Sequence, residues 1–373
     1  MSSEKMPPLR IGNWQADVPI IQGGMGVGIS LSGLASAVAN AGGIGVISTA
    51  GVGQFEEDKT NYREANNRAL RKQIRNAKSK TDGLIGINIM CALTDFDDIV
   101  QCAVDEGANM LFLGAGLPIR LPKTLPLDNL GSLSTKFVPI VSSGKATKII
   151  FRSWAKQFNH VPDAVVLEGP LAGGHLGYKK ENIDNPDFAL EKILPDVIAA
   201  VKPYQEKFNK NIPVIAAGGI FTGSDIYRIM QLGASGVQMG TRFVATNECD
   251  AYQGFKDAYL NCKKEDIIII DSPVGLPGRA IKDKFLERVS AGIKETFKCP
   301  WKCLVSCDFK NVPYCIAVAL TNAKKGDMDK GFAFAGANAY RVDKVVPVQE
   351  LIDVLIAEYA AEALKGSVST PTT

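Results

Sequence analysis

IAAGGIFTGSDI, residues 215 to 226, and VQMGTRFVATNE, residues 237 to 248, are the most informative part of the sequence for the fold. Each segment begins with a short apolar run that predicts a buried strand, and each continues through a glycine loop. The two loops place four residues at the ends of adjacent strands, namely Gly218, Gly219, Gly240 and Thr241. Backbone amides there, helped by a helix N-terminus, predict a phosphate site of the kind that barrels build after their last strands. Two purely structural turns are the alternative.

Short apolar segments alternate with helical patterns over the first two-thirds of the chain. Eight of these segments predict strands, at residues 18–21, 44–47, 84–90, 110–113, 137–141, 164–167, 213–216 and 236–239. Strands that are apolar on both faces indicate a parallel sheet covered by helices. Eight such units favour an α/β fold of the (β/α)8 TIM barrel type over an open, doubly wound sheet.

The pattern changes near residue 246, where helical segments begin to dominate. These are predicted at 252–263, 280–295 and 315–324, and a further helix at 348–364 is expected to return to the barrel. We therefore expect three parts along the chain: a barrel over 1–245, a mostly helical cap over 246–345, and a final barrel helix with a frayed tail over 346–373.

The overall composition excludes several classes of protein. The 373 residues are 46% hydrophobic and 22% charged, and the formal net charge is +3. This charge is too small and too evenly spread to predict a nucleic-acid or membrane partner. The N-terminus lacks the apolar core of a signal peptide, and no apolar run is long enough to span a bilayer. We expect a cytoplasmic enzyme that acts on a small molecule, with a homodimer as a candidate assembly.

Two more segments carry candidate binding residues. QGGMGVGIS, residues 22–30, contains four closely spaced glycines, more than a tight turn needs, which would let the backbone approach a flat aromatic ligand. It is similar to a dinucleotide fingerprint but lacks the acidic residue that should follow. GINIM, residues 86–90, places Asn88 in an otherwise apolar strand. That amide must bond either to nearby backbone or to a ligand.

EGPLAGGHLGY, residues 168–178, carries one of the two histidines of the chain. The segment follows a predicted buried strand and brings His175 to the end of that strand, where α/β folds keep their chemistry. An imidazole with a pKa of about 6.5 can accept or donate a proton near neutral pH. A histidine that only bonds to loop carbonyls is the alternative. His160 stands in a polar loop and is expected to be a surface residue.

In order along the chain, these segments resemble the nitronate monooxygenase family, formerly called 2-nitropropane dioxygenases. The family includes FMN-dependent enoyl-acyl-carrier-protein reductases and NADH:quinone reductases. The matching segments are IIQGGMGVGIS, AGGIGVIS, GINIM, GAGLP, EGPLAGGHLG, PVIAAGGIFTGSDI and GVQMGTRFVATNE. They lie between about residue 18 and residue 250 and so cover the barrel. The resemblance implies a TIM barrel that binds FMN without a covalent bond at its C-terminal mouth.

The resemblance also implies roles for individual residues. His175 aligns with the active-site histidine of the family. The implied FMN contacts, from the ring through the ribityl chain to the phosphate, are Gly23, Gly24, Met25, Asn88, Gln238, Glu168, Gly218, Gly219, Gly240 and Thr241. The leading activity implied is oxidation of alkyl nitronates with O2. The alternative is an NAD(P)H-dependent FMN reductase for an enoyl thioester or a quinone, and a non-catalytic flavin-binding protein is a third reading.

Four of the eight cysteines lie close together in the C-terminal third, at Cys299, Cys303, Cys307 and Cys315. The first three recur every four residues and would share one face if the segment were helical. Pro300 and Pro313 instead favour a loop-rich setting. Four thiolates would bind an iron–sulfur cluster or zinc, although the spacing lacks the CxxC pattern, and buried inert thiols are the alternative. This segment, SPVGLPGR at 272–279 and GFAFAGANAYR at 331–341 are less typical of the family. We expect all three to cover the flavin and select the substrate.

Overall fold

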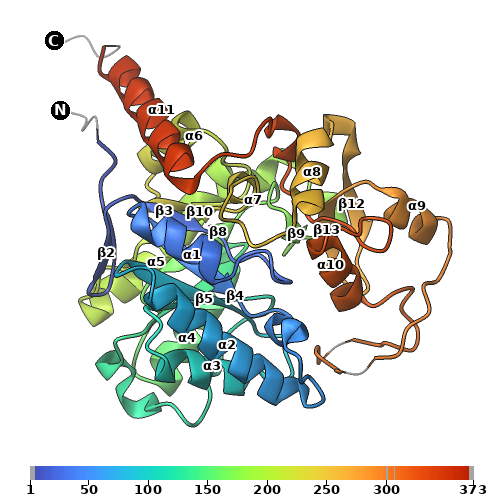
Figure 1. Cartoon of the computed structure of the whole chain (residues 1–373). Coiled ribbons are helices and arrows are strands. Elements are labelled where there is room, and N and C mark those ends of the chain that lie inside the picture. Colours follow the sequence, from blue (N-terminus) through green and yellow to red (C-terminus); the bar gives the residue numbers. More distant parts are fainter. Residues whose placement is uncertain (1–4, 300, 306, 369–373) are drawn as a thin grey trace.

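The computed structural model describes residues 5–299, 301–305 and 307–368, and it confirms the predicted (β/α)8 barrel (Figure 1). Eight strands, each parallel to its neighbours, form a closed barrel. They are β3 (Ile20–Gln22), β4 (Ile44–Ser48), β5 (Leu84–Met90), β6 (Met110–Gly114), β7 (Lys136–Val141), β8 (Val165–Glu168), β10 (Val214–Ala217) and β11 (Gly236–Met239). Each predicted strand overlaps one of these, and β5 and β11 coincide with their predicted ranges.

Helices cover the outside of the barrel. They are α1 (Ser32–Asn40), α2 (Tyr62–Lys78), α3 (Phe96–Asp105), α4 (Gly144–Gln157), α5 (Leu190–Phe208), α6 (Gly223–Gln231) and α11 (Val348–Val368). The connection between β6 and β7 contains a 3-10 segment, η2 (Leu127–Ser132), in place of an α-helix. As predicted, α11 returns after the insertion and packs against α6 and α1 (Figure 1). Residues 369–373 of the predicted frayed tail lie outside the described residues.

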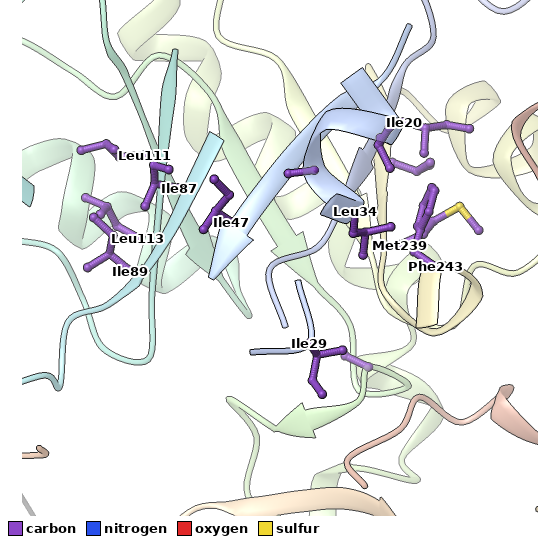
Figure 2. Close-up of a cluster of buried hydrophobic side chains, with 14 of the residues drawn as sticks. Ile20, Ile29, Leu34, Ile47, Ile87, Ile89, Leu111, Leu113, Met239 and Phe243 are labelled. Carbon is purple, nitrogen blue, oxygen red and sulfur yellow. The ribbon is translucent and has the colours of Figure 1, made fainter. Parts of the chain in front are cut away.

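Two hydrophobic layers result from the alternation of side chains along each strand. Val46 points into the barrel with Ile21 and Phe112, whereas the next residue, Ile47, joins the layer between strands and helices. Figure 2 shows part of that outer layer, including Leu34 of α1. Burying one such aliphatic side chain contributes about 1.5–3 kcal/mol to the free energy of unfolding. Both layers therefore hold the strand ends in place.

A short hairpin covers the N-terminal end of the barrel. Its strands, β1 (Leu9–Ile11) and β2 (Trp14–Ala16), pair antiparallel, and Leu9 is buried with the residues of the barrel interior. A Cβ atom on Gly236, the first residue of β11, would lie 3.2 Å from Leu9. The hairpin therefore fills the bottom of the barrel and leaves the C-terminal mouth for a ligand.

The cap is less helical than predicted. A short helix, α7 (Thr241–Val244), directly follows β11 and precedes the cap. The cap contains α8 (Gln253–Asn261), α9 (Lys284–Ser290) and α10 (Ile316–Lys324), which Figure 1 places to one side of α11. It also contains an antiparallel hairpin, β12 (Ile267–Asp271) and β13 (Pro277–Ile281), which the sequence reading missed. The predicted helix at 280–295 is wrong at both ends. Its first residues pair with β12, and α9 ends at Ser290.

The cysteine-bearing segment is not helical. Among its described residues, 291–315 contains no helix, so the cysteines do not share a helix face and the loop-rich alternative holds. Instead, Leu304 forms a β-bridge with Leu93 in the loop after β5. The backbone N–H of Thr94 also donates to the carbonyl of Cys303 at 3.1 Å. Pairing with the barrel loop, not local helix formation, determines the path of this segment.

In the described part of the chain, no helix has the length and apolar character needed to cross a membrane.

Candidate active site

A cavity of about 580 Å³ lies at the C-terminal mouth of the barrel. Each of the eight barrel strands contributes its last residues or the residue that follows to the wall, and the cap supplies the rest. All of the residues predicted to be catalytic or to contact FMN line this one cavity: Gly23, Gly24, Met25, Asn88, Glu168, His175, Gly218, Gly219, Gln238, Gly240 and Thr241. Residues from five separate segments of sequence are thus brought together around one space.

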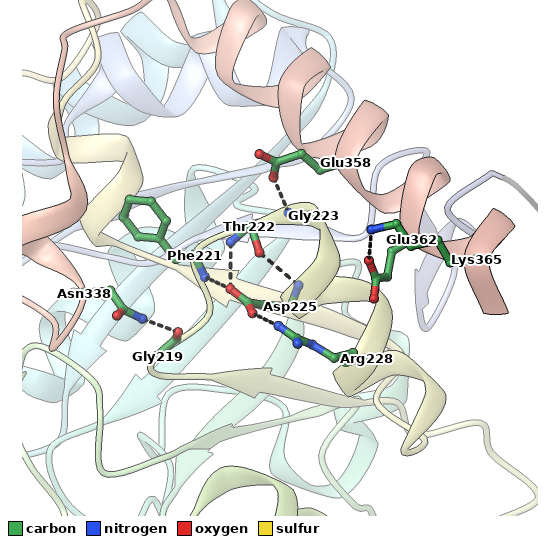
Figure 3. A network of polar contacts seen from close by, with 10 residues as sticks. All are labelled: Gly219, Phe221, Thr222, Gly223, Asp225, Arg228, Asn338, Glu358, Glu362 and Lys365. Carbon is green, nitrogen blue, oxygen red and sulfur yellow. Dashed lines mark hydrogen bonds and ion pairs between the residues drawn. The ribbon is translucent and has the colours of Figure 1, made fainter.

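The loops after β10 and β11 form one end of this wall. Gly218 and Gly219 have φ values of +91° and +84°, which residues with a Cβ rarely adopt. The carbonyl of Gly219 accepts a hydrogen bond of 2.6 Å from Asn338, so the cap fixes the loop (Figure 3). No described residue accepts a hydrogen bond from the backbone N–H of Gly219, Gly240 or Thr241. These N–H groups therefore remain for an anionic ligand.

Of the two helices that follow these loops, α6 does not contribute its N-terminus to this site, whereas α7 (Thr241–Val244) begins at Thr241, one of the residues with a free N–H. The N–H of Gly223 donates to Glu358 of α11 at 2.6 Å (Figure 3). The N–H groups of Phe221 and Thr222 donate to the carboxylate of Asp225 at 3.1 and 2.9 Å. Protein carboxylates thus satisfy the N–H groups of Phe221, Thr222 and Gly223. A phosphate would depend on the N–H groups of the two glycine loops and of Thr241 at the start of α7.

Glycines at the other end of the cavity let the backbone pass close to polar side chains. A Cβ atom on Gly24 would lie 2.3 Å from the Cβ of Asn88, so no larger residue fits there. On Gly23 it would lie 3.4 Å from Gln238. The amide nitrogen of Asn88 donates to the carbonyl of Phe112 at 3.4 Å while the residue still lines the cavity. The structure thus shows the bond to backbone considered for Asn88, while its bond to a ligand stays a prediction.

His175 belongs to β9 (Gly174–His175), a two-residue strand that pairs with β13. Its Nε2 atom lies 2.7 Å from the Oγ of Ser272, and its ring meets that of Phe334 edge to face at 4.9 Å. Burial lowers the pKa of His175 to about 4 because a charged imidazolium would lose its hydration. The imidazole is therefore neutral at physiological pH.

A buried arginine fixes the loop that carries His175. Nη1 of Arg279 donates to the carbonyls of Pro170 and Ala172 at 2.6 and 2.7 Å. Gly173 passes so close to the cap that a Cβ would lie 2.5 Å from the carbonyl carbon of Ala335. The glycines of this loop therefore allow close packing against the cap. Glycines lose much conformational entropy when the chain folds, and the hydrogen bonds of Arg279 help to offset that loss.

Glu168 ends β8 and lines the same cavity. Burial raises the pKa of its carboxyl to about 7, and no described cation forms an ion pair with it. Its backbone carbonyl accepts a hydrogen bond of 2.7 Å from Tyr178. A carboxyl group with a raised pKa in the same cavity as a neutral histidine is typical of an active site.

Comparison with known proteins identifies the family. The model of the nitronate monooxygenase family matches residues 9–358. This chain belongs to the nitronate monooxygenase family. The family consists of FMN-dependent oxidoreductases, as the sequence motifs predicted. The match also includes the cap, which the motifs left uncovered.

Three relatives illustrate the range of this family. A probable nitronate monooxygenase of Staphylococcus saprophyticus is 26% identical over 309 residues, covering 73% of this chain and 78% of its own. A (3aS,4S,5R,7aS)-5-hydroxy-7a-methyl-1-oxo-octahydro-1H-indene-4-carboxyl-CoA dehydrogenase of Mycobacterium tuberculosis is 28% identical over 274 residues. That alignment covers 74% of this chain and 66% of the dehydrogenase. The structure of FabK from Thermotoga maritima superposes with a TM-score of 0.72 at 28% identity, covering 94% of this chain and 96% of FabK.

Within this nitronate monooxygenase family member, the sequence reading missed the cap residues that support His175. Ser272 and Arg279 are the first and last residues of SPVGLPGR, and Phe334 belongs to GFAFAGANAYR. Both segments were expected near the flavin and substrate, but nothing in them indicated which side chains would reach His175. The sequence did contain a signal for Arg279. An arginine among glycines, prolines and apolar residues is unusual, and it indicates a buried guanidinium whose hydrogen bonds are satisfied within the protein.

Two other sequence expectations need correction. His160 is half-buried, not a surface residue, and lies 3.4 Å from Nζ of Lys210. Burial and this ammonium lower its pKa to about 4. Of the four clustered cysteines, Cys303 lines the cavity, and burial raises the pKa of its thiol to about 12. Across the described residues, no three His, Cys, Asp or Glu side chains are grouped as metal ligands.

Proposed function

We propose that this protein is an FMN-dependent oxidoreductase of the nitronate monooxygenase type, which oxidises alkyl nitronates with O2. The observation that carries the proposal is the position of the neutral imidazole of His175 in the wall of the cavity that all the FMN-contact candidates also line. A histidine that served only its loop would not need to face this cavity. Membership of the nitronate monooxygenase family supports the same assignment.

The residues present fit FMN. Unpaired N–H groups of Gly219, Gly240 and Thr241 suit a phosphate, and the close approach of Gly24 to Asn88 leaves a flat backbone surface for a ring. The cavity volume is also in the range of sites for small molecules and cofactors. When bound, FMN supplies the transfer of electrons to and from the substrate.

The chain itself contributes proton transfer and orientation. Ser272 holds Nε2 of His175, and no described residue forms a hydrogen bond with Nδ1, so we assign Nδ1 to proton exchange with the substrate. A neutral imidazole can take a proton from the carbon of a nitroalkane or, in the Nδ1–H tautomer, donate one to a substrate that is being reduced. Glu168 adds a second group that titrates near neutral pH.

A reductase of enoyl thioesters or quinones, with NAD(P)H as the electron donor, is the second candidate. It is favoured by the length of the cavity, which continues past the FMN residues to Leu93, Ile316 and Leu320 under the cap. A small alkyl nitronate would leave these apolar side chains without contact. The mycobacterial relative named as a dehydrogenase of a carboxyl-CoA compound is consistent with a larger substrate.

Anaerobic stopped-flow absorbance tests these functions. The FMN-bound protein is mixed separately with propyl-2-nitronate, NADH and NADPH, and the visible flavin band is followed. Bleaching by the nitronate, with little response to either pyridine nucleotide, is the result expected of a nitronate monooxygenase. Bleaching by NADH or NADPH alone would instead assign the reductase function. A His175→Ala variant that turned over every substrate like the wild type would indicate a non-catalytic flavin-binding protein.

A metal at Cys299, Cys303, Cys307 and Cys315 stays a hypothesis that the arrangement of these side chains does not support. Iron and zinc analysis of protein purified without oxygen tests it. A stoichiometric amount of either metal, lost when Cys307 is replaced by alanine, would establish the site. Protein with neither metal would eliminate it.

A further inference from the structure

The cavity at the mouth of the barrel has one acidic side chain and no basic one among the described residues that line it. The acid is Glu168, and none of the lining residues is a lysine, an arginine or an aspartate. The proposed function brings an anionic nitronate into this cavity, where no described cation offers its charge a partner. The charge of the cavity therefore bears on which substrates it accepts.

Glu168 points into the barrel. Along β8, Val166 belongs to the layer inside the barrel and Leu167 to the layer between strands and helices. Because side chains alternate along a strand, Glu168 faces the same side as Val166 and so reaches the cavity above the barrel interior. On the two neighbouring strands, Ala217 pairs with Glu168 and Ser142 follows the last pair, and neither side chain carries a charge.

The carboxyl group of Glu168 has no partner. No described residue forms a hydrogen bond or an ion pair with it, and burial raises its pKa to about 7. The hydroxyl of Tyr178 donates to the backbone carbonyl of Glu168 instead, and burial raises the pKa of that hydroxyl. The carboxyl oxygens are not among the fully buried polar atoms that lack a partner, so a ligand in the cavity can approach them. Glu168 is thus neutral below about pH 7 and negatively charged above it.

The other titratable groups of the described wall keep one charge state near neutral pH. They are Tyr62, His175, Tyr259 and Cys303. Burial lowers the pKa of His175 to about 4 and raises that of Cys303 to about 12, so both are neutral. Burial also raises the pKa of both tyrosines above the ordinary value. Arg279 lies behind the wall, where Nη1 donates to two backbone carbonyls. One carboxyl group therefore sets how the charge of the cavity changes with pH.

We propose that Glu168 selects substrates by charge: the cavity accepts a neutral molecule at any pH, whereas an anion such as a nitronate binds only together with a proton on Glu168. A carboxylate and an anion in one cavity without a cation repel each other strongly, because the surrounding medium screens charge poorly. This inference rests on the proposed function, since it takes FMN and its substrate to share the cavity. Glu168 acts here through its charge, in addition to the flavin contact that the resemblance implies.

The test uses two planar probes of the same shape and different charge. Benzoate, like a nitronate, carries one negative charge spread over two oxygens, and benzamide is its neutral counterpart. Each is titrated into the FMN-bound protein at pH 6, 7 and 8, and the flavin spectrum reports binding. The wild type should bind benzoate about tenfold more weakly at pH 8 than at pH 6, because a group with a pKa of about 7 is protonated at the lower pH and ionised at the higher. The affinity for benzamide should stay within about twofold.

Proton uptake provides a second measurement that needs no variant. Isothermal titration calorimetry of the FMN-bound wild type at pH 8 is run in HEPES and in Tris, whose enthalpies of ionisation differ. Binding of benzoate should take up close to one proton per molecule, and binding of benzamide should take up none.

A variant connects the effect to Glu168. Glu168→Gln keeps the shape of the side chain and removes its charge, so the affinity for benzoate should no longer depend on pH. At pH 8 it should exceed that of the wild type about tenfold. The matched control is Glu191→Gln, because Glu191 is exposed on α5 and does not line this cavity. His175→Ala should retain the pH dependence of the wild type, since the imidazole is neutral throughout.

The outcomes separate this inference from the function beneath it. With FMN bound, a benzoate affinity that is independent of pH, or that declines equally in Glu168→Gln, would overturn the role of Glu168. Absence of benzamide binding at every pH would overturn it too, because a neutral planar ligand is what the cavity is inferred to accept. Protein that failed to bind FMN at all would instead refute the proposed function.

Discussion

Nε2 of His175 lies 2.7 Å from Oγ of Ser272, and this contact joins a loop of the barrel to the cap. Gly278 of β13 pairs with His175 through the backbone as well, so one hairpin fixes both the main chain and the side chain. The orientation of the imidazole thus depends on residues almost a hundred positions away in the sequence. A barrel without this hairpin would still present His175 but would not direct its ring.

Replacing His175 by alanine should abolish proton transfer but retain the flavin. The expected loss in kcat/KM is about 10²- to 10⁴-fold, because a positioned general acid or base contributes that much. FMN content should stay near that of the wild type, since the phosphate is assigned to N–H groups of other loops. The control is His160→Gln, which changes the other histidine outside the cavity. Equal losses in the two variants would contradict the assignment.

Ser272→Ala should leave His175 in place but free its ring to rotate. We expect kcat to fall about tenfold, as one hydrogen bond that orients the imidazole is lost. KM should change little, because Ser272 is not assigned to substrate. Steady-state kinetics of this variant and of Ser153→Ala, which alters a hydroxyl bonded to Ile119 away from the cavity, measure the difference. A change in KM alone would argue that Ser272 contacts substrate instead.

The pH dependence of the reaction should report the buried environment of His175. Because burial lowers its pKa to about 4, the base remains neutral as the pH falls through the ordinary range of histidine. The limb of the kcat/KM profile due to His175 should therefore lie near pH 4 and vanish in His175→Ala. A limb at the ordinary histidine pKa would contradict this environment.

The same lowered pKa affects stability. As the pH falls, the histidine of the unfolded chain binds a proton before that of the folded protein does, so the free energy of unfolding decreases as the pH falls from 6.5 toward 4.

Glu168→Gln should stabilise the FMN-free protein at high pH. The folded-state pKa is raised to about 7 from 4.5, so the folded protein retains a proton that the unfolded chain has lost. The free energy of unfolding thus decreases as the pH rises from 4.5 to 7, and the loss is complete above the folded pKa. Glutamine avoids this loss, and we expect a gain of about 2 kcal/mol at pH 8 and little change at pH 4. Urea denaturation measures it, and a variant less stable than the wild type at pH 8 would be the contrary result.

Gly24→Ala should disrupt the flavin-facing surface. The added Cβ would lie 2.3 Å from the Cβ of Asn88, so either the loop or β5 must shift. FMN affinity is expected to fall at least about tenfold, and the protein should lose about 1–3 kcal/mol of stability from overpacking. Gly131→Ala is the control, because its Cβ would meet nothing closer than 3.8 Å. Undiminished FMN binding by Gly24→Ala would exclude this loop from the flavin site.

The barrel was predictable because its pattern is local. Each strand is a short apolar run, and the glycine loops that follow it carry residues such as Gly218 whose positive φ can be anticipated from the residue type. The β12–β13 hairpin was not predictable in the same way. Ala280 and Ile281 look helical in sequence but pair with β12, so tertiary contacts override local preference. The partners of His175, namely Ser272 and Phe334, depend on that distant packing.

The affinity of the protein for FMN compared with riboflavin tests the central claim most directly. Riboflavin has the same ring but no phosphate, so it cannot use the unpaired N–H groups of Gly219, Gly240 and Thr241. We predict one FMN bound per chain, at least about 100-fold more tightly than riboflavin, because hydrogen bonds to a charged group are strong. Equal affinities, or no flavin bound in either titration, would contradict the phosphate site and the function built on it.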